Sequence, residues 1–228
     1  MLDRSPAAAK ARHPGHGGTP LHLCAHSGWD AAARTLLEAG ANPNVPDEAY
    51  GALPLHIALS KGHVPVAMRL IEANSNRHHR HKNQYTPLMV ALEHRHVDCV
   101  EALLKAGINP MEGPQDMPLM AWACLKWELM PGEEQQDACT AMTRHLIAYG
   151  CDVDALAMEG WTALMFASTL GQYGVVRELL ERGADRDRKN NKGERAADLA
   201  RKSLKNAQDQ RDARSASLLE RTLLALQG

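Results

Sequence analysis

Histidine clustering is the feature of this sequence most able to support chemistry. The segment Arg77-His-His-Arg-His-Lys82 is entirely basic, and His94 and His96 follow it closely. Transition-metal sites take their geometry from an HxxxH pair on one helix face or from Cys and His at fixed spacing. The cluster has neither pattern, and adjacent side chains of an extended segment point apart. We therefore predict no metal site and interpret the cluster as a solvated basic loop, whose charge could steer an acidic partner.

Other catalytic groupings are also missing from the sequence. It contains no GxSxG nucleophile elbow and no glycine-rich phosphate loop. The carboxylate pairs at 152/154 and 185/187 follow helix stops, where turn chemistry alone favours Asp. We expect His22 and His56 to bond to the backbone of neighbouring loops. The prediction is a protein that is not an enzyme and has no cofactor; a His-dependent metal-binding enzyme is the remote alternative.

Composition narrows the class of protein. Hydrophobic residues make up 44% of the 228, and they are mostly Ala and Leu with one Phe, which favours helices. The net charge of −1 does not suggest a nucleic-acid partner. The five Cys include no CxxC pair, so we expect a reducing, cytoplasmic setting without disulfides. No apolar run is long enough to span a membrane.

The elements that position these residues recur along the chain. A three-residue motif, in which Thr, Leu or Met precedes Pro-Leu or Ala-Leu, recurs along the chain. Its copies begin at residues 19, 53, 86, 117 and 162. A pair of adjacent aliphatic residues follows each start by 17 residues, except in the fourth copy, which carries 12 extra residues. Thr caps a helix, Pro fits its first turn, and Gly ends it. A period near 33 with two helices per copy indicates a solenoid.

The segments Thr19-Pro-Leu-His-Leu-Cys-Ala25, Gly28 and Leu36-Leu-Glu-Ala-Gly-Ala-Asn42 together resemble the ankyrin repeat. The resemblance implies an all-α ankyrin-repeat solenoid of stacked helix-turn-helix units. It also implies short β-hairpin-like fingers between repeats and a concave recognition face. We expect residues 1–18 to form an N-terminal arm and 19–228 a single domain, closed by a degenerate cap at 195–228.

The copies depart from the repeat pattern in two ways. The motif His is present at 22 and 56 but is replaced by Met89, Met120 and Met165. The fourth copy has Trp122 where Ala is expected, and an insertion within residues 126–140. We expect its first helix to run through Leu129 and its second helix to start early. The insertion is either a tolerated loop or an element that contacts a partner or bends the stack.

Aromatic residues near the finger bases are the candidate contacts. The residue before each repeat start should face the concave side, and Tyr and Trp are common at interface hot spots. Alternatively, each ring covers the core of a neighbouring repeat. The predicted partner-binding residues are Tyr85, Trp161, Tyr50, Trp29, Trp127, Asp116, Glu159 and His94.

These features predict a non-catalytic protein-protein interaction module that binds a protein partner through its concave face and fingers. We expect a monomer without nucleic-acid or membrane partners. Almost the whole chain consists of repeats, so we expect the stack itself to carry the function. A sharper hypothesis is therefore an immunity protein that neutralises a cognate bacterial toxin or enzyme. The same features are compatible with a secreted bacterial effector and with a self-associating scaffold.

Overall fold

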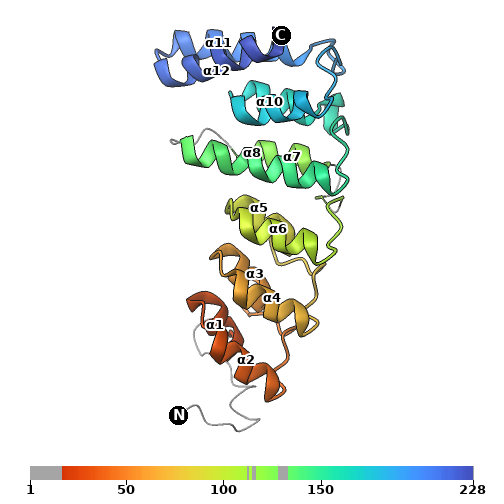
Figure 1. Cartoon of the computed structure of the whole chain (residues 1–228). Coiled ribbons are helices and arrows are strands. Elements are labelled where there is room, and N and C mark those ends of the chain that lie inside the picture. Colours follow the sequence, from red (N-terminus) through yellow and green to blue (C-terminus); the bar gives the residue numbers. More distant parts are fainter. Residues whose placement is uncertain (1–16, 112, 115–116, 128–132, 228) are drawn as a thin grey trace. The chain divides into compact units, whose positions relative to one another are not determined.

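The computed structural model describes residues 17–111, 113–114, 117–127 and 133–227, and its regular elements within these ranges are helices (Figure 1). The predicted all-α class is therefore confirmed. Contacts divide the chain into two compact units, Met1–Ile108 (unit 1) and Asn109–Gly228 (unit 2). The single domain expected over residues 19–228 stays a prediction, and most of the expected N-terminal arm lies outside the described residues.

Each unit is built from helix pairs. Unit 1 contains α1 (Pro20–Ser27), α2 (Asp30–Glu38), α3 (Pro54–Ser60), α4 (Val64–Glu72), α5 (Pro87–Glu93) and α6 (Val97–Lys105). Unit 2 contains α7 (Leu119–Lys126), α8 (Glu133–Ala148), the short η2 (Met158–Gly160), α9 (Ala163–Thr169), α10 (Tyr173–Glu181), α11 (Ala196–Asp209) and α12 (Ala213–Gln227).

The first helix of a pair packs against first helices, and the second against second helices. In unit 1, α3 contacts α1 and α5, while α4 contacts α2 and α6. In unit 2, α9 contacts α7 and α11, while α10 contacts α8 and α12. Leu55 and Leu88 are fully buried in unit 1, as Leu164 and Leu179 are in unit 2. Burial of such a side chain stabilises by about 1.5–3 kcal/mol, so each pair depends on its neighbours.

Local signals define where the helices begin. The Oγ1 atoms of Thr86 and Thr162 each accept a hydrogen bond from the third residue of the helix, at 3.3 Å. Pro occupies the first helical position of α1, α3 and α5. The first turn of a helix leaves backbone N–H groups unpaired. The Thr side chain accepts a hydrogen bond from one of them, and Pro has no N–H group to pair.

Turn chemistry after each second helix repeats along the chain. In each turn a side-chain oxygen accepts the backbone N–H two residues later, at 2.9–3.0 Å. Such Asx turns stabilise the chain reversal locally. The accepting residues are Asn42, Asn76, Asn109, Asp152 and Asp185. The carboxylates of Asp152 and Asp185 therefore serve loop geometry, as expected.

The fingers are hairpin-like turns without strands in the described residues. In unit 1, the N–H of Asp47 donates to the carbonyl of Ala52, and the N–H of His81 donates to that of Tyr85. The two fingers are joined because the N–H of Lys82 donates to the carbonyl of Tyr50 at 2.8 Å. Unit 2 repeats this link between Asn191 and Glu159, at 2.9 Å.

The fourth copy differs from the expectation at its first helix. Helix α7 ends at Lys126, and Trp127 follows it with φ −85° and ψ 41°, so the helix is shorter than the predicted run through Leu129. Leu129 lies outside the described residues. The second helix does start early: α8 has 16 residues, whereas α4, α6 and α10 have 9 each.

Histidine rings connect successive repeats of unit 1 at the turn between paired helices. His63 Nε2 bonds to the carbonyl of His26 at 3.2 Å, and His96 Nε2 bonds to that of Ser60 at 3.1 Å. Each ring lies against a glycine of the preceding repeat: a Cβ at Gly62 would be 2.9 Å from His96 Nδ1. The glycine therefore provides space for the ring as well as a left-handed turn with φ 75°.

A second set of histidine bonds lies at the finger bases. The N–H of Leu53 donates to His56 Nδ1 at 3.2 Å, so the ring carries its proton on Nε2, which donates to the carbonyl of His79 at 3.1 Å. His22 has the same arrangement with Thr19 and with the carbonyl of Ala52. A neutral ring is needed at both places, because Nδ1 must remain an acceptor. The expected backbone role of His22 and His56 is thus present in the structure.

Comparison of two glycines tests the contribution of the His96 contact. Both Gly40 and Gly62 have positive φ, but a Cβ at Gly40 meets nothing within 4 Å. Gly40→Ala should cost about 1 kcal/mol of unfolding free energy from backbone strain alone. Gly62→Ala should cost about 2 kcal/mol more, because the ring must move and lose its bond to Ser60. Urea unfolding measures both, and equal losses would contradict the role of the contact.

The buried ring of His56 predicts a pH dependence of stability. Burial lowers the pKa of His56 from 6.5 to about 3, and the neighbouring His81 ring makes a smaller contribution to this shift. Between these values the unfolded chain takes up a proton that the folded chain does not, so stability is lost as the pH falls below 6.5. The unfolding free energy should drop by about 2 kcal/mol between pH 7 and pH 5.

The His56→Met variant provides the comparison, because Met occupies the equivalent position at residues 89, 120 and 165. This variant should have a smaller loss of unfolding free energy between pH 7 and pH 5, measured by urea unfolding at both values. A loss as large as that of the unsubstituted protein would assign the pH dependence to other groups.

Candidate functional site

A groove in unit 1 brings several predicted contact residues together. Its volume is about 230 Å³, and it lies between two successive fingers and the first helices α3 and α5. Three of the predicted contact residues line it: Tyr50 and Tyr85 from the fingers, and His94 from the end of α5. The complete lining consists of Tyr50, Ala52, His56, Ile57, Ser60, His81, Asn83, Tyr85, Val90, Glu93 and His94.

The fingers hold the two tyrosines by their backbones. The N–H of Tyr50 donates to Asp47 Oδ1 at 2.6 Å, and its carbonyl accepts from Lys82 of the next finger. The Tyr50 side chain is 65% exposed, so a rigid backbone presents a large, accessible ring. Tyr85 is half-buried, and its ring lies 5.5 Å from that of His81. Such pre-positioned rings lose little conformational entropy on binding.

The groove is weakly charged at neutral pH. Burial lowers the pKa of His81 and of His94, and the Glu93 carboxylate opposes this shift only partly. The His81 ring also lies 5.3 Å from that of His56, whose pKa is lowered further. Neutral imidazoles beside two tyrosines favour an apolar or aromatic ligand surface with hydrogen-bonding groups at its edge.

Two aliphatic residues of the groove were missed by the sequence reasoning. Ile57 and Val90 occupy the same register, four residues after their repeat starts, and both line the groove. Leu23 has this register in the first repeat and is 55% exposed. The repeat period could have identified both residues, because positions that recur at this period share one face of the stack.

In unit 2, Trp161 takes the place that Tyr85 has in unit 1. Its ring lies 4.9 Å from Phe166, which has the register of Ile57 and Val90. Glu159 is exposed in η2 with a positive φ of 57° and pairs with Lys192 at 3.1 Å. Trp161 and Glu159 are therefore near the finger of unit 2, and their role in binding stays a prediction.

The remaining predicted contacts lie elsewhere. Trp127 is 3% exposed, and its carbonyl accepts a bond from Gln172 Nε2 at 2.8 Å. Its ring therefore has no surface for a partner, and we correct that prediction. Trp29 is 54% exposed at the start of α2, outside the groove. Asp116 lies outside the described residues.

The basic cluster is partly exposed, as expected of a solvated loop, but several of its side chains also bond to neighbouring loops. Arg77 Nη1 donates to the carbonyl of Ala106, and His79 Nε2 bonds to that of Gly51 at 2.8 Å. Lys82 Nζ donates to the carbonyls of Glu48 and Ala49, both at 2.7 Å. These side chains join loops of adjacent repeats because carbonyls at repeat ends lack backbone partners. His78 and Lys82 are exposed, and the other residues of the cluster are half-buried.

The described residues contain no group of three or more His, Cys, Asp or Glu side chains placed to hold a metal ion. Within the same ranges, helices long and apolar enough to cross a membrane are also absent. All five cysteines are buried as free thiols, and burial raises the pKa of Cys99 and of Cys151 to about 11. Such thiols are poor nucleophiles.

The chain is similar in sequence to several known proteins. A sequence model described as "Ankyrin repeats (3 copies)" matches residues 21–113 and 133–206. The neurogenic locus notch homolog protein 4 of Homo sapiens is 58% identical over 43 residues, which are 19% of this chain and 2% of that protein. Ankyrin repeat protein nuc-2 of Neurospora crassa is 29% identical over 127 residues, or 45% of this chain and 12% of nuc-2. The chain thus spans a small part of these relatives.

Solved structures resemble the chain over most of its length. The ankyrin repeat domain of Bcl-3 has a TM-score of 0.69 and 24% identity, covering 92% of this chain and 82% of that one. A chain from the complex of the predatory endopeptidase Bd0816 of Bdellovibrio bacteriovorus with the immunity protein Bd3460 has a TM-score of 0.61 and 25% identity. That match covers 89% of this chain and 97% of the other. Since the sequence model matches more than half of the 228 residues, the chain belongs to the ankyrin repeat family.

Proposed function

We propose that this chain is a non-catalytic module that binds a protein partner through the fingers and first helices of unit 1. The observation that supports the proposal most directly is the groove, where Tyr50 and Tyr85 from successive fingers flank Ile57 and Val90. Ankyrin repeats are generally protein-protein interaction modules, and their function depends on surface residues carried by a common fold.

The chemistry of the groove suggests the contact surface of the partner. The two tyrosines supply large rings with hydroxyl groups, and the aliphatic residues supply an apolar floor. His94 and Glu93 lie at the end of α5 and give the rim hydrogen-bonding groups. An apolar side chain of the partner would be buried between the rings, as at the anchor residues of other protein interfaces. Trp161 and Glu159 of unit 2 are further proposed contacts.

Replacement of both tyrosines tests the groove. Tyr50→Ala/Tyr85→Ala should weaken the complex with the native partner by at least about tenfold, because hot-spot aromatic residues contribute about 2 kcal/mol or more. The partner is first captured from the native cell and identified by mass spectrometry, and its affinity is then measured by calorimetry with purified proteins. Circular dichroism and the melting temperature report whether the variant remains folded.

Tyr149→Ala is the matched control, because Tyr149 is an exposed tyrosine in unit 2, outside the groove. This variant should bind as the unsubstituted protein does. Unchanged affinity of a folded Tyr50→Ala/Tyr85→Ala variant would refute the assignment of the groove. Trp161→Ala, measured separately, tests the contact proposed in unit 2.

A second candidate is an immunity or inhibitor protein. The specific observation in its favour is the likeness to a chain of the endopeptidase and immunity-protein complex, which extends over 89% of this chain. A stable surface that covers the active site of an enzyme would inhibit it without any chemistry of its own. The groove is suited to this role, since hydrogen bonds hold the finger backbones that carry Tyr50 and Tyr85 before binding.

Inhibition distinguishes this candidate from a general binding module. If the captured partner is a toxin or hydrolase, addition of one equivalent of this chain should abolish its activity, and co-expression should protect cells from it. Tyr50→Ala/Tyr85→Ala should require at least about tenfold more protein for the same inhibition. Full partner activity in the saturated complex, or cells that remain sensitive to the toxin, would exclude the inhibitor role.

A further inference from the structure

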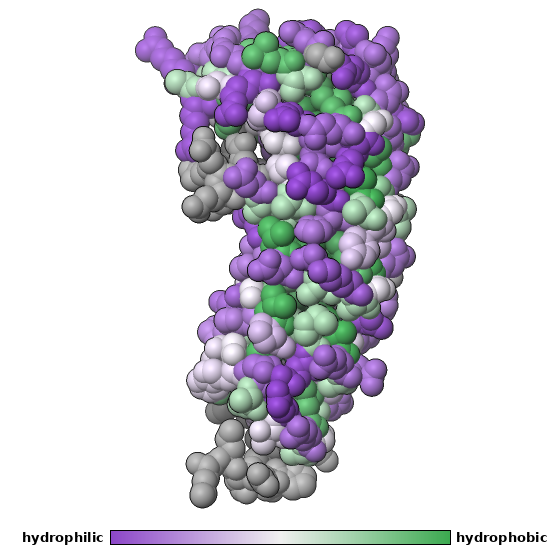
Figure 2. Space-filling model, viewed as in Figure 1, coloured by the Kyte–Doolittle hydropathy of each residue, from purple (hydrophilic) through white to green (hydrophobic). Residues whose placement is uncertain are grey.

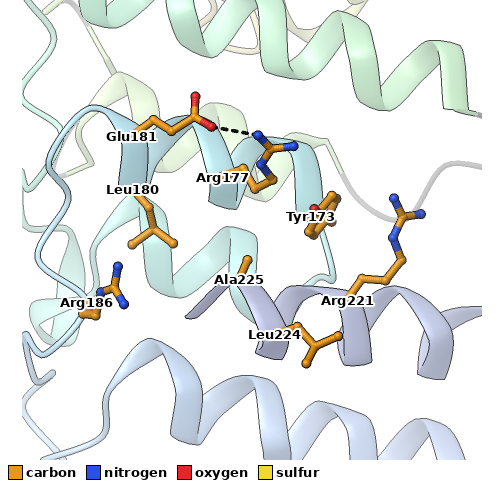
Figure 3. A pocket seen from close by; sticks show the side chains of 8 residues that line it. All are labelled: Tyr173, Arg177, Leu180, Glu181, Arg186, Arg221, Leu224 and Ala225. Atoms are coloured by element: carbon orange, nitrogen blue, oxygen red, sulfur yellow. Dashed lines mark hydrogen bonds and ion pairs between the residues drawn. The ribbon is translucent and has the colours of Figure 1, made fainter. Parts of the chain in front are cut away.

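Unit 2 contains a larger pocket on the side of its second helices. Its volume is about 480 Å³, and it is formed by α10, α12 and the loop that follows α10 (Figure 3). This pocket is separate from the groove of unit 1, which lies on first helices and fingers. The lining residues are Tyr173, Arg177, Leu180, Glu181, Arg186, Arg221, Leu224 and Ala225.

Two of the pocket's arginines have no carboxylate partner among the described residues. Arg177 pairs with Glu181 at 2.9 Å, so its charge is largely balanced. Arg186 and Arg221 form no ion pair within the described parts of the chain. The guanidinium of Arg221 instead lies over the Tyr173 ring, 4.6 Å from its centre. Stacking holds the planar group in place and leaves its N–H donors available.

Apolar side chains separate these two charges. Figure 3 shows Arg186 on one side of the pocket and Arg221 with Tyr173 on the other, with Leu180, Ala225 and Leu224 between them. Leu224 is 69% exposed although it belongs to the amphipathic helix α12. On the face shown in Figure 2, hydrophobic side chains occur among many hydrophilic ones. The pocket thus combines an exposed aliphatic surface with two guanidinium groups that no described carboxylate neutralises.

An adjoining cavity extends the pocket toward α8. It shares Tyr173, Arg177, Glu181 and Arg221 with the pocket and has a volume of about 320 Å³. Arg144 lies in this cavity, but it pairs with the buried Glu178 at 2.9 Å. Glu178 also pairs with Arg182 at 3.0 Å, so both of these arginines are held by ion pairs, and within the described residues the guanidinium groups without an ion pair at the pocket are those of Arg186 and Arg221.

We propose that this pocket binds an acidic peptide segment of a protein partner, in which aliphatic residues lie between two carboxylates. The carboxylates would pair with Arg186 and Arg221, whose forked donors suit bidentate recognition. The aliphatic side chains would cover Leu224, Leu180 and Ala225 and remove this surface from water. The two guanidinium groups favour an acidic ligand. The apolar side chains that lie between them favour a peptide with aliphatic residues over an isolated anion.

Synthetic peptides test the proposal without knowledge of the partner. The probe is a fluorescein-labelled peptide, Gly-Asp-Leu-Leu-Glu-Gly, compared with Gly-Asn-Leu-Leu-Gln-Gly by fluorescence anisotropy with the full chain. At about 50 mM salt the acidic peptide should bind at least about tenfold more tightly than the amide peptide. A third peptide, Gly-Asp-Ala-Ala-Glu-Gly, should also bind more weakly, because it lacks the leucine side chains.

Variants assign the binding to the two arginines. Arg186→Gln/Arg221→Gln should lose the preference for the acidic peptide, while Arg34→Gln/Arg214→Gln, an equal change in charge at exposed positions, should keep it. Circular dichroism confirms that both variants fold. Tyr50→Ala/Tyr85→Ala should bind the peptide normally, so failure of this proposal and failure of the groove assignment give different results.

Three results would overturn the proposal. The first is no detectable binding of the acidic peptide, or equal binding of its amide form. The second is an acidic preference that survives in Arg186→Gln/Arg221→Gln. The third is competition by inorganic phosphate at concentrations similar to those of the peptide, which would assign the arginines to a small anion.

Discussion

Hydrogen bonds from one repeat to the backbone of an adjoining repeat are the interaction on which each unit depends. A pair of short helices cannot bury its own apolar face, and its loop carbonyls are left without partners. In unit 1, His22, His56, His63 and His96 bond to such carbonyls. In unit 2, Gln172 reaches the carbonyls of Cys124 and Trp127 at 2.7 and 2.8 Å. The groove in unit 1 has a defined shape because the His56 bond to the carbonyl of His79 and the finger-to-finger bond from Lys82 to Tyr50 hold its walls.

The repeats and helices were predictable from the sequence because their signals are local. Thr86 and Thr162 cap helices, and Pro20, Pro54 and Pro87 begin them. Tyr50 and Tyr85 were predictable as neighbours in the groove because the repeat period puts finger bases on one face. The same periodicity would have identified Ile57 and Val90.

Other features depend on contacts between distant residues. Trp127 is buried because α7 ends before it and Gln172, far along the chain, bonds to its carbonyl. The basic residues at 77–82 act as loop ties because carbonyls of adjacent repeats lie within their reach. The pocket of unit 2 depends on Arg186, in the loop after α10, and Arg221, on α12, lining one pocket, and no spacing in the sequence indicates that. The two sites therefore differ in chemistry: one is aromatic and weakly charged, the other is cationic.

Hydrogen exchange of the complex with the native partner tests most directly whether the groove is the binding surface. The backbone amides of the two fingers and of α3 and α5, in residues 47–60 and 81–94, should exchange more slowly in the complex than in the free chain. Amides at the exposed turn around Tyr149 should exchange at the same rate in both. Slower exchange confined to the second helices α2, α4 and α6, with unchanged exchange in the fingers, would contradict the account.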